Sequence, residues 1–565
     1  MLERLRLIAA LTLLLHLSAC AGLDASRSAS PVQLRILAIN DFHGNLQPPG
    51  GGIRIRDPQD AAKNLLVPAG GAEYLATAVK ELRRGHENHV FVAAGDLIGA
   101  SPLLSALFHD EPTIEALSLM GLEISSVGNH EFDAGADELL RKQSGGCHPV
   151  DGCKGPKPFA GAGFKYLAAS TWDTHTQRTI LPAYQVRSFD GIPVAFIGLT
   201  LKGTPDMVMP TGVAGLRFDD EADTVNRLVP ELRAQGIESI VVLIHEGGFP
   251  TGDYNECPGI SGAIVDIVRR LDKAVDLVIS GHTHSAYVCS IDGRLVTSGD
   301  KYGTIVSTID LQIDRGTRNV SSARASNVIV RNDTYAKDQQ QTDLLAAYAR
   351  LATPLAQRAI GRIGGAFTRD PNTSLASAAG QLVADAQLAA TIAPEHGGAV
   401  IAFANAGSPR GSSGSVRTSL LPEVNGTVRY GQLFAMQPFA NNLVTMTLSG
   451  EQIRQLLEQQ WRDDNSFGEF LQVSSGFEYR WANSQGKNRH VVPGSLMLHG
   501  KPLEPAEAYR VTVNSFMAEG GGGLRVLLEG RDRRTGIVDV AALEQYLAAN
   551  PGLTPSPLDR IRRVD

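Results

Sequence analysis

The sequence has no basic block, no low-complexity tract and no internal repeat. Its formal net charge is −7, which argues against a general nucleic-acid-binding protein and against a nucleic-acid polymer as partner. After the N-terminal segment there is no run of about 18 apolar residues that could cross a membrane. A chain of 565 residues is too long for one hydrophobic core, so we expect two or more globular domains.

The N-terminal segment has the pattern of a targeting signal. Arg4 and Arg6 precede the short apolar run Leu7–Leu17, and the next residues up to Cys20 resemble a lipoprotein processing site. We expect a signal peptide over residues 1–20, with Cys20 carrying the lipid, and a tether over residues 21–32. The alternative is a plain signal peptide with an incidental cysteine. The predicted location is the periplasm, and Ala21 favours the outer over the inner membrane for a lipid anchor, the only expected membrane contact.

Export would place the four other cysteines in an oxidising compartment. Cys147 and Cys153 lie six residues apart in a loop rich in glycine and proline, and we expect them to form a disulfide. Cys257 and Cys289 would then form a second disulfide between two loops that follow strands. Four cysteines allow three connectivities, so this pairing stays open at the level of sequence. A zinc site is the competing interpretation, but CxxC spacing is absent.

Short apolar runs in the first half of the chain predict buried strands that alternate with helices. Stretches with helical apolar spacing separate several of these runs, so we predict an α/β fold. Five of the runs end directly before polar residues that can bind metal: Leu34–Ile39, Val90–Ala94, Ile124–Val127, Ile240–Ile244 and Leu277–Ser280. Ligands bind beyond the carboxyl ends of strands in such sheets, so we expect these polar residues to meet at one sheet edge.

The candidate metal ligands are two aspartates, one asparagine and four histidines. They are Asp41, His43, Asp96, Asn129, His245, His282 and His284. Mixed nitrogen and oxygen ligands suit divalent ions such as Zn, Mn or Co. Seven ligands exceed what one ion takes, so we predict two ions that share a carboxylate, clamp a phosphoryl group and lower the pKa of a water. Any one of these histidines could instead be an ordinary core or loop residue.

The segments that carry these residues resemble the blocks of calcineurin-like metallophosphoesterases. The spellings Asn40-Asp41-Phe42-His43-Gly44 and Gly128-Asn129-His130-Glu131-Phe132-Asp133 are similar to the bacterial 5′-nucleotidase family, which includes UDP-sugar hydrolases. The resemblance implies a four-layer αββα sandwich with a second, α+β substrate-binding domain. It also implies that Asp41, His43, Asp96 and His284 hold one ion and that Asp96, Asn129, His245 and His282 hold the other. His130 and Asp133 would be the catalytic dyad.

The resemblance extends to the C-terminal half and implies substrate contacts there. Arg410 would bind the phosphate, two phenylalanines would stack on a base, and two asparagines would lie near it; these residues are Asn405, Arg410, Phe439, Asn441 and Phe516. Gly522 stands where the family usually has an aspartate that contacts the sugar hydroxyls. The loss of this acceptor predicts weaker discrimination in favour of ribose.

These observations predict a phosphoesterase domain over residues 33–335 and a recognition domain over 361–565. Residues 336–360 between them are the predicted connecting helix, where Thr342–Ala359 has apolar residues at helical spacing. The predicted function is metal-dependent hydrolysis of a small-molecule phosphate ester, most simply a nucleotide. The alternatives are a hydrolase of 2′,3′-cyclic nucleotides or of nucleotide sugars, and a binding lipoprotein that keeps the metal site without catalysis.

Overall fold

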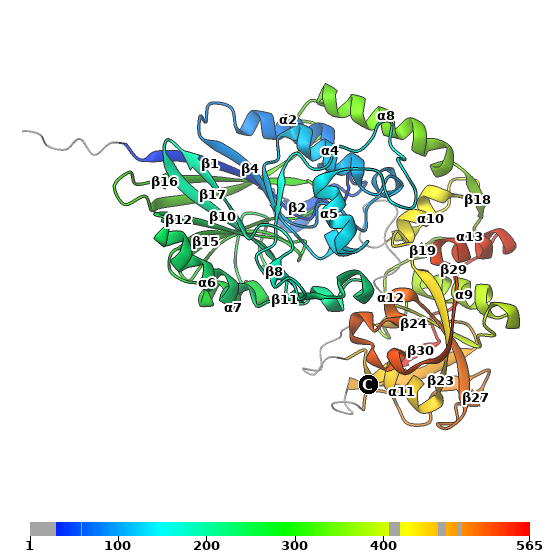
Figure 1. Cartoon of the computed structure of the whole chain (residues 1–565). Coiled ribbons are helices and arrows are strands. Elements are labelled where there is room, and N and C mark those ends of the chain that lie inside the picture. Colours follow the sequence, from blue (N-terminus) through cyan, green and yellow to red (C-terminus); the bar gives the residue numbers. More distant parts are fainter. Residues whose placement is uncertain (1–29, 58, 406–417, 462–469, 484–488) are drawn as a thin grey trace, which may run out of the picture.

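The computed structural model describes residues 30–57, 59–405, 418–461, 470–483 and 489–565. Within them, the first domain is built on two six-stranded sheets (Figure 1). The first sheet has the order β17 (Val320–Ile329), β16 (Ile305–Ile313), β1 (Val32–Ile39), β4 (His89–Ala94), β5 (Ile124–Ser126) and β6 (Lys165–Leu167). The second has the order β14 (Ala286–Ile291), β15 (Arg294–Gly299), β13 (Val275–Ser280), β12 (Ser239–His245), β10 (Ile192–Thr200) and β9 (Tyr184–Phe189).

The two sheets pack face to face, and helices cover their outer faces. Ile36 of β1 shares an apolar cluster with Val241 of β12, whereas its neighbour Leu37 shares one with Leu75 and Ile114. This alternation follows from the period of two residues along a strand. The outer helices of the first sheet are α2 (Ala72–Leu82) and α4 (Glu111–Met120), and those of the second are α6 (Glu221–Ala234) and α7 (Ala263–Arg270). The predicted four-layer αββα sandwich is confirmed.

Smaller elements fill the connections of the first domain. Short helices α3 (Leu103–Ala106) and α5 (Ala136–Ser144) lie near the strand ends. The remaining strands are β2 (Ile53–Asp57), β3 (Asp60–Val67), β7 (Thr171–Asp173), β8 (Arg178–Thr179) and β11 (Leu216–Phe218). Helix α8 (Gln339–Ala356) then leads towards the second domain, and the Gln341 amide donates a hydrogen bond to the carbonyl of Ala116 in α4 (2.9 Å). This helix therefore packs on the first domain along its start.

The second domain has its own sheet and core. Its main sheet has the order β24 (Leu471–Val473), β20 (Ile401–Asn405), β28 (Ala508–Asn514), β23 (Asn442–Ser449) and β29 (Arg531–Val538). A smaller sheet contains β27 (Lys501–Pro502), β26 (Met497–Leu498), β25 (Phe477–Trp481) and β30 (Ile561–Arg563). The helices are α9 (Ala378–Thr391), α10 (Tyr430–Met436), α11 (Gly450–Glu458), α12 (Ser515–Ala518) and α13 (Asp539–Ala549). Two short pairs, β18 (Ala359–Arg362) with β22 (Thr427–Arg429) and β19 (Phe367–Thr368) with β21 (Thr418–Leu420), complete it.

Two disulfides connect the predicted cysteine pairs. Cys147 bonds to Cys153, and Cys257 bonds to Cys289, so the predicted connectivity is confirmed and the zinc interpretation is wrong. The second bond differs in one respect from the expectation of two linked loops, because Cys289 lies within strand β14. Cys20 lies outside the described residues.

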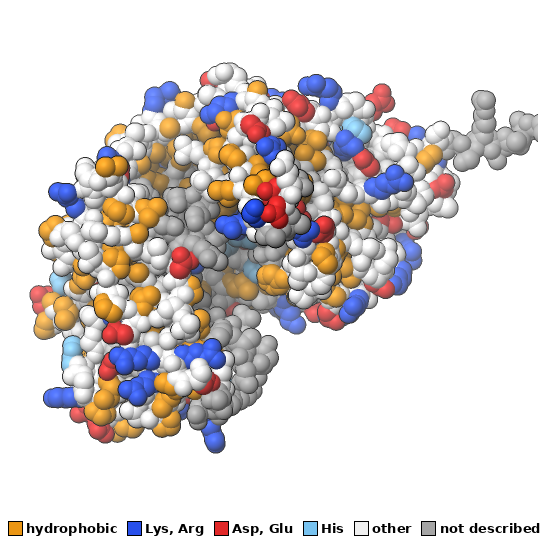
Figure 2. Space-filling view, turned by 180° about the vertical axis from the view of Figure 1, so that it is seen from behind, with side chains coloured by type: hydrophobic (Ala, Val, Ile, Leu, Met, Phe, Trp, Pro, Cys, Tyr) orange, Lys and Arg blue, Asp and Glu red, His pale blue; other side chains and the backbone are white. Residues whose placement is uncertain are grey.

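The surface carries no broad patch of one charge on the face shown in Figure 2, where basic and acidic side chains are interspersed. This distribution agrees with the modest net charge of −7. Within the described residues, no helix is both long enough and apolar enough to span a bilayer.

Candidate metal centre

The seven predicted metal ligands all lie at the ends of parallel strands. Strands of the first sheet precede four of them and strands of the second sheet provide three: β1 precedes Asp41 and His43, β4 precedes Asp96, β5 precedes Asn129, β12 ends at His245, and β13 precedes His282 and His284. The prediction of one sheet edge is therefore wrong. Two stacked sheets present their strand ends at the same end of the sandwich, and the ligands meet across the gap between them.

The loops that carry these ligands bend sharply at the ligands themselves. Five of the seven have positive φ angles between 46° and 69°: Asp41, His43, Asp96, His282 and His284. This conformation costs non-glycine residues on the order of 1–3 kcal/mol each and persists where the surroundings fix it. Five residues with this unfavourable backbone conformation occur at one site, so the surrounding structure must stabilise the geometry of that site.

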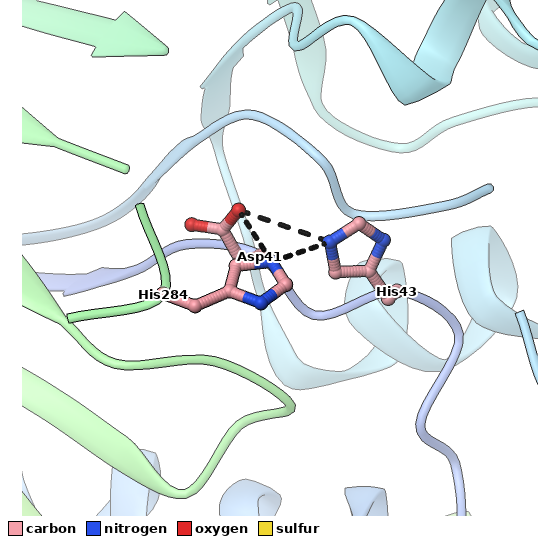
Figure 3. A group of neighbouring side chains, drawn as sticks. All are labelled: Asp41, His43 and His284. Carbon is pink, nitrogen blue, oxygen red and sulfur yellow. Dashed lines mark hydrogen bonds and ion pairs between the residues drawn. The ribbon is translucent and has the colours of Figure 1, made fainter. Parts of the chain in front are cut away.

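Asp41, His43 and His284 form the first group of ligand atoms (Figure 3). The Nε2 atoms of His43 and His284 lie 3.1 Å apart, and Asp41 Oδ1 lies 3.3 Å from His284 Nε2 and 3.8 Å from His43 Nε2. Three donor atoms at such separations can ligate one ion at about 2.0–2.2 Å from each atom after small adjustments.

Asp96, His245 and His282 form the second group. Asp96 Oδ2 lies 2.9 Å from His245 Nε2 and also 3.7 Å from His43 Nε2 of the first group. The other Asp96 oxygen, Oδ1, accepts a hydrogen bond from the backbone N–H of His130 (2.9 Å). One carboxylate oxygen thus faces both groups, as the prediction of a shared ligand requires.

Backbone carbonyls orient two of the histidine rings through Nδ1, the ring nitrogen that faces away from the ligand groups. His43 Nδ1 donates a hydrogen bond to the carbonyl of Gly99 (2.9 Å), and His245 Nδ1 donates one to the carbonyl of Ala94 (2.8 Å). A carbonyl only accepts, so each Nδ1 carries a proton and each Nε2 is directed into the site as the atom that can bind a metal.

A buried atom at the centre supports a metal site over a site of protein hydrogen bonds alone. Among the described residues, Asn129 Oδ1 is buried and makes no hydrogen bond of standard geometry. Buried polar atoms without a partner are costly and rare. Its position beside two carboxylates and four imidazoles fits a pair of divalent cations such as Zn, Mn or Co.

The electrostatics of the groups favour ionised carboxylates. Burial acts to raise the pKa of Asp96, but the nearby His245 and His130 outweigh burial and hold this pKa well below its usual range. Burial lowers the pKa of His282 and His284 to about 4, so both are neutral at pH 7. Burial also acts to lower the pKa of His245, but the Asp96 carboxylate raises it to about 10. Cation binding at His245 is therefore linked to release of a proton.

The predicted dyad is assembled at the edge of these groups. His130 Nδ1 lies 2.8 Å from Asp133 Oδ2 on the same 3-10 turn, so the carboxylate fixes the ring and its tautomer. The rings of His130 and His43 have centroids 5.0 Å apart, which places the dyad beside the first group. His130 also stacks on Phe439 of the second domain, with centroids 6.1 Å apart and an interplanar angle of 14°.

Two supporting residues have roles that the sequence did not reveal. Glu131 is buried, and its carboxylate accepts hydrogen bonds from the backbone N–H groups of Gly128 (2.6 Å), Leu97 (2.7 Å) and Asp96 (2.9 Å). Asn40 donates to Asp41 Oδ2 (2.7 Å) and to the carbonyl of Asp300 (2.7 Å). Both residues belong to the recognised motifs, but only the fold shows which loops they connect.

A cavity of about 1590 Å³ extends from this centre between the two domains. Asn129, His130, Asp133 and His282 line its first-domain wall. The second-domain wall includes four of the five predicted substrate residues, Asn405, Phe439, Asn441 and Phe516, together with Gly522. Arg410, the fifth, lies outside the described residues. The structure thus brings these four predicted recognition residues to the same cavity as the metal groups.

Comparison with known proteins assigns both halves of the chain. Residues 34–286 match the family model for calcineurin-like phosphoesterases, and residues 358–529 match the 5′-nucleotidase C-terminal domain. A 5′-nucleotidase of Vibrio vulnificus is 24% identical over 582 residues, covering 97% of this chain and 95% of the relative. The crystal structure of a 5′-nucleotidase precursor from Thermus thermophilus shares the fold, with a TM-score of 0.73, 24% identity and coverage of 94% of this chain and 99% of that one.

Another relative is longer than this chain. The endonuclease YhcR of Bacillus subtilis is 31% identical over 522 residues, which cover 91% of this chain but 40% of the relative. The cell wall protein Lmo0130 of Listeria monocytogenes is likewise matched over 65% of its length.

Both domain matches agree with the observed architecture and with the ligand groups of the first domain. The chain belongs to the 5′-nucleotidase family of metal-dependent phosphoester hydrolases, in which a calcineurin-like phosphoesterase domain is joined to a 5′-nucleotidase C-terminal domain.

Proposed function

We propose that the chain is a dimetal phosphohydrolase that releases phosphate from a nucleotide. One observation carries this proposal: a single Asp96 oxygen faces both ligand groups, and the predicted dyad and the interdomain cavity adjoin them. The first ion would be held by Asp41, His43, Asp96 and His284, and the second by Asp96, Asn129, His245 and His282. When bound, such a pair of ions activates a water and neutralises charge on the phosphoryl oxygens.

The residues of the chain supply the remaining chemistry. His130, held by Asp133, faces the cavity and can stabilise or protonate the leaving oxygen as charge develops on it. The ring of Phe439 lies nearly parallel to that of His130, with centroids 6.1 Å apart, so the second domain reaches the dyad. We assign His130 the catalytic role and Asp133 the role of orienting it.

Recognition of the organic part of the substrate is proposed for the second domain. Phe439 and Phe516 offer aromatic surfaces for a base, and Asn405 and Asn441 offer amides. Arg410 remains the proposed phosphate ligand. Gly522 has no side chain that could accept a hydrogen bond from ribose hydroxyls, so we propose weak discrimination between ribose and deoxyribose.

Metal-dependent turnover tests this function. The purified protein should release p-nitrophenol from p-nitrophenyl phosphate and phosphate from AMP when Mn or Zn is supplied, and EDTA should abolish both activities reversibly. Deoxy-AMP should be hydrolysed with a kcat/KM close to that of AMP, and a strong preference for AMP would refute the role given to Gly522. No turnover of any phosphate ester with any of these metals would favour a binding lipoprotein over an enzyme.

Phosphodiester hydrolysis is the second candidate. The cavity volume of about 1590 Å³ exceeds the roughly 300–1,000 Å³ typical of small-molecule sites. A substrate with groups on both sides of the phosphorus, such as a 2′,3′-cyclic nucleotide or a nucleotide sugar, would use more of this space. The endonuclease among the relatives also belongs to a class that cuts phosphodiesters. Faster turnover of bis(p-nitrophenyl) phosphate than of the monoester would favour this candidate.

We further propose that the protein is exported to the periplasm and anchored through Cys20 to a membrane that borders it. Two disulfides support an oxidising compartment. Cys20→Ala should convert a membrane-associated protein into one that is released on cell fractionation, and unchanged membrane association would contradict the lipid anchor.

A further inference from the structure

A run of four glycines, Gly520–Gly523, follows helix α12, and its last two residues line the cavity. Gly520, Gly522 and Gly523 have φ angles of 86°, 68° and 78°. These angles lie in the left-handed region, which side chains disfavour, so the backbone itself accounts for glycine at these three positions. Gly521 is the exception, because its φ lies outside this region and its backbone conformation does not require glycine.

The ring of Phe516 accounts for glycine at position 521. A Cβ atom at this position would lie 2.4 Å from Phe516 Cε2, 2.5 Å from Cδ2 and 2.6 Å from Cζ. Carbon atoms that are not bonded approach one another to about 3.5–4.0 Å, so a side chain at position 521 and the ring cannot both keep these places. An atom beside the ring edge would be clearly nearer to one ring atom than to its neighbours. The almost equal distances to three adjacent atoms therefore place Gly521 against a face of the ring.

Helix α12, which carries this ring, is itself anchored in the second domain. The Asn514 side chain caps the helix by accepting a hydrogen bond from the N–H of Met517 (2.9 Å). Met517 and Ala518 are buried and belong to the apolar core of the domain. The backbone of Phe516 is thereby held, so the ring can change its plane only by turning about its side-chain bonds. Gly521 is buried against the ring, whereas Phe516 itself lines the cavity.

We propose that Gly521 is a positioning residue that sets the plane of the Phe516 ring, so that a flat organic group of the substrate stacks on the ring face turned away from Gly521. The inference rests on the proposed function and deepens it, because it assigns the stacking surface to a single face of one ring. A base stacks on an aromatic ring when the two planes are parallel. A methyl group at position 521 would displace the ring, and the base would lose part of this contact.

Gly521→Ala tests this role, because alanine fits the backbone conformation of Gly521 and meets only the ring. We expect the KM for AMP to rise about 3- to 10-fold with little change in kcat, since part of the stacking is lost. The KM for p-nitrophenyl phosphate, which lacks a nucleobase, should change less. Adenosine, which has the base but no phosphate, should bind more weakly by a similar factor in calorimetric titration.

A double variant separates the ring from other effects of the substitution. Gly521→Ala combined with Phe516→Ala should have the same KM for AMP as Phe516→Ala, because the added methyl group then has no ring to displace. Effects of the two substitutions that multiply would contradict the inference.

Gly536→Ala is the matched control. Gly536 lies in β29 of the same domain, its φ is also outside the left-handed region, and it does not line the cavity. A Cβ atom there would lie 3.6 Å from the carbonyl oxygen of Leu443 and 3.8 Å from its Cβ, which is ordinary contact. This substitution should leave the KM for AMP unchanged, which excludes a general effect of adding a methyl group to the domain.

Two further results would overturn the inference: an unchanged KM for AMP in Gly521→Ala, or equal increases for AMP and p-nitrophenyl phosphate. If circular dichroism shows that Gly521→Ala does not fold, the double variant should fold, because the ring that the methyl group meets is gone. A double variant that also fails to fold would contradict the inference. Absence of turnover by the wild-type enzyme on both substrates would instead reject the proposed function.

Discussion

The two domains hold their functional residues in different ways. In the first, Asp41, His43 and Asp96 follow strand ends directly, and backbone groups fix their side chains. In the second, side chains from separate segments hold each other, as Asn514 donates to Asn405 Oδ1 (3.0 Å) and Ser515 donates to Asn441. Backbone groups give the fixed geometry that metal chemistry needs, whereas contacts between two side chains can be exchanged more readily. We expect changes in the first domain to lower kcat for every substrate and changes in the second to raise KM selectively.

The largest expected effect is that of His130→Ala. Loss of the group that stabilises the leaving oxygen should lower kcat by about 10²–10⁴-fold. The loss should be similar for AMP and p-nitrophenyl phosphate, because His130 acts on the phosphoryl group. Metal content, measured by mass spectrometry, should be unchanged. A variant that keeps more than about a tenth of the wild-type kcat would contradict the catalytic role.

Glu131→Gln should weaken metal binding. The Glu131 carboxylate now accepts hydrogen bonds from three backbone N–H groups. In the glutamine variant, the NH₂ group would face one of these N–H groups, and two donors cannot bond to each other. The loops that carry Asp96 and Asn129 should therefore separate. Loss of such a supporting partner costs about 10- to 100-fold in metal affinity. Titration with Mn followed by activity measures this change. Glu73→Gln, a buried glutamate that pairs with Lys337 away from the site, should leave the affinity unchanged.

Phe516→Ala tests the expectation that changes in the second domain raise KM selectively. Loss of a stacking surface should raise the KM for AMP about tenfold, with kcat almost unchanged. The KM for p-nitrophenyl phosphate, which lacks a nucleobase, should change less. An equal increase for both substrates would show that this residue supports the cavity in general, and the division of labour between the domains would then be wrong.

The smallest effect is on stability. Burial raises the pKa of Asp276 to about 7, above the ordinary value of 3.8, so the folded state binds this proton more tightly than the unfolded state. The stability that this proton gives is present below pH 4 and is lost as the pH rises to about 7. The variant Asp276→Asn has no carboxyl group at this position, so its stability does not fall in this way as the pH rises. Its melting temperature should match that of the wild type near pH 4 and exceed it by a few degrees at pH 8, as measured by calorimetry; an equal difference at both pH values would contradict this origin.

The sequence predicted the strand ends of the first domain well, and each predicted ligand lies within a few residues of its strand. The predicted run Leu277–Ser280, for example, is the end of β13, and His282 and His284 follow it at once. The predicted connecting helix over Thr342–Ala359 is observed as Gln339–Ala356, and Ala359 instead begins β18. Its end was missed because the apolar spacing continues beyond the last helical turn.

By itself, the sequence determined which residues have side chains that can bind metal and that Cys147 and Cys153 lie close enough along the chain to pair, since both depend on side-chain chemistry and short local patterns. Only the tertiary structure decided that the ligands come from two sheets, that Glu131 binds the backbone of two loops, and that Asn40 binds the carbonyl of Asp300. These relations join residues separated by tens to hundreds of positions, through backbone groups that every residue possesses. Such groups leave no pattern in the sequence, so their partners become defined only when the strands are paired and packed.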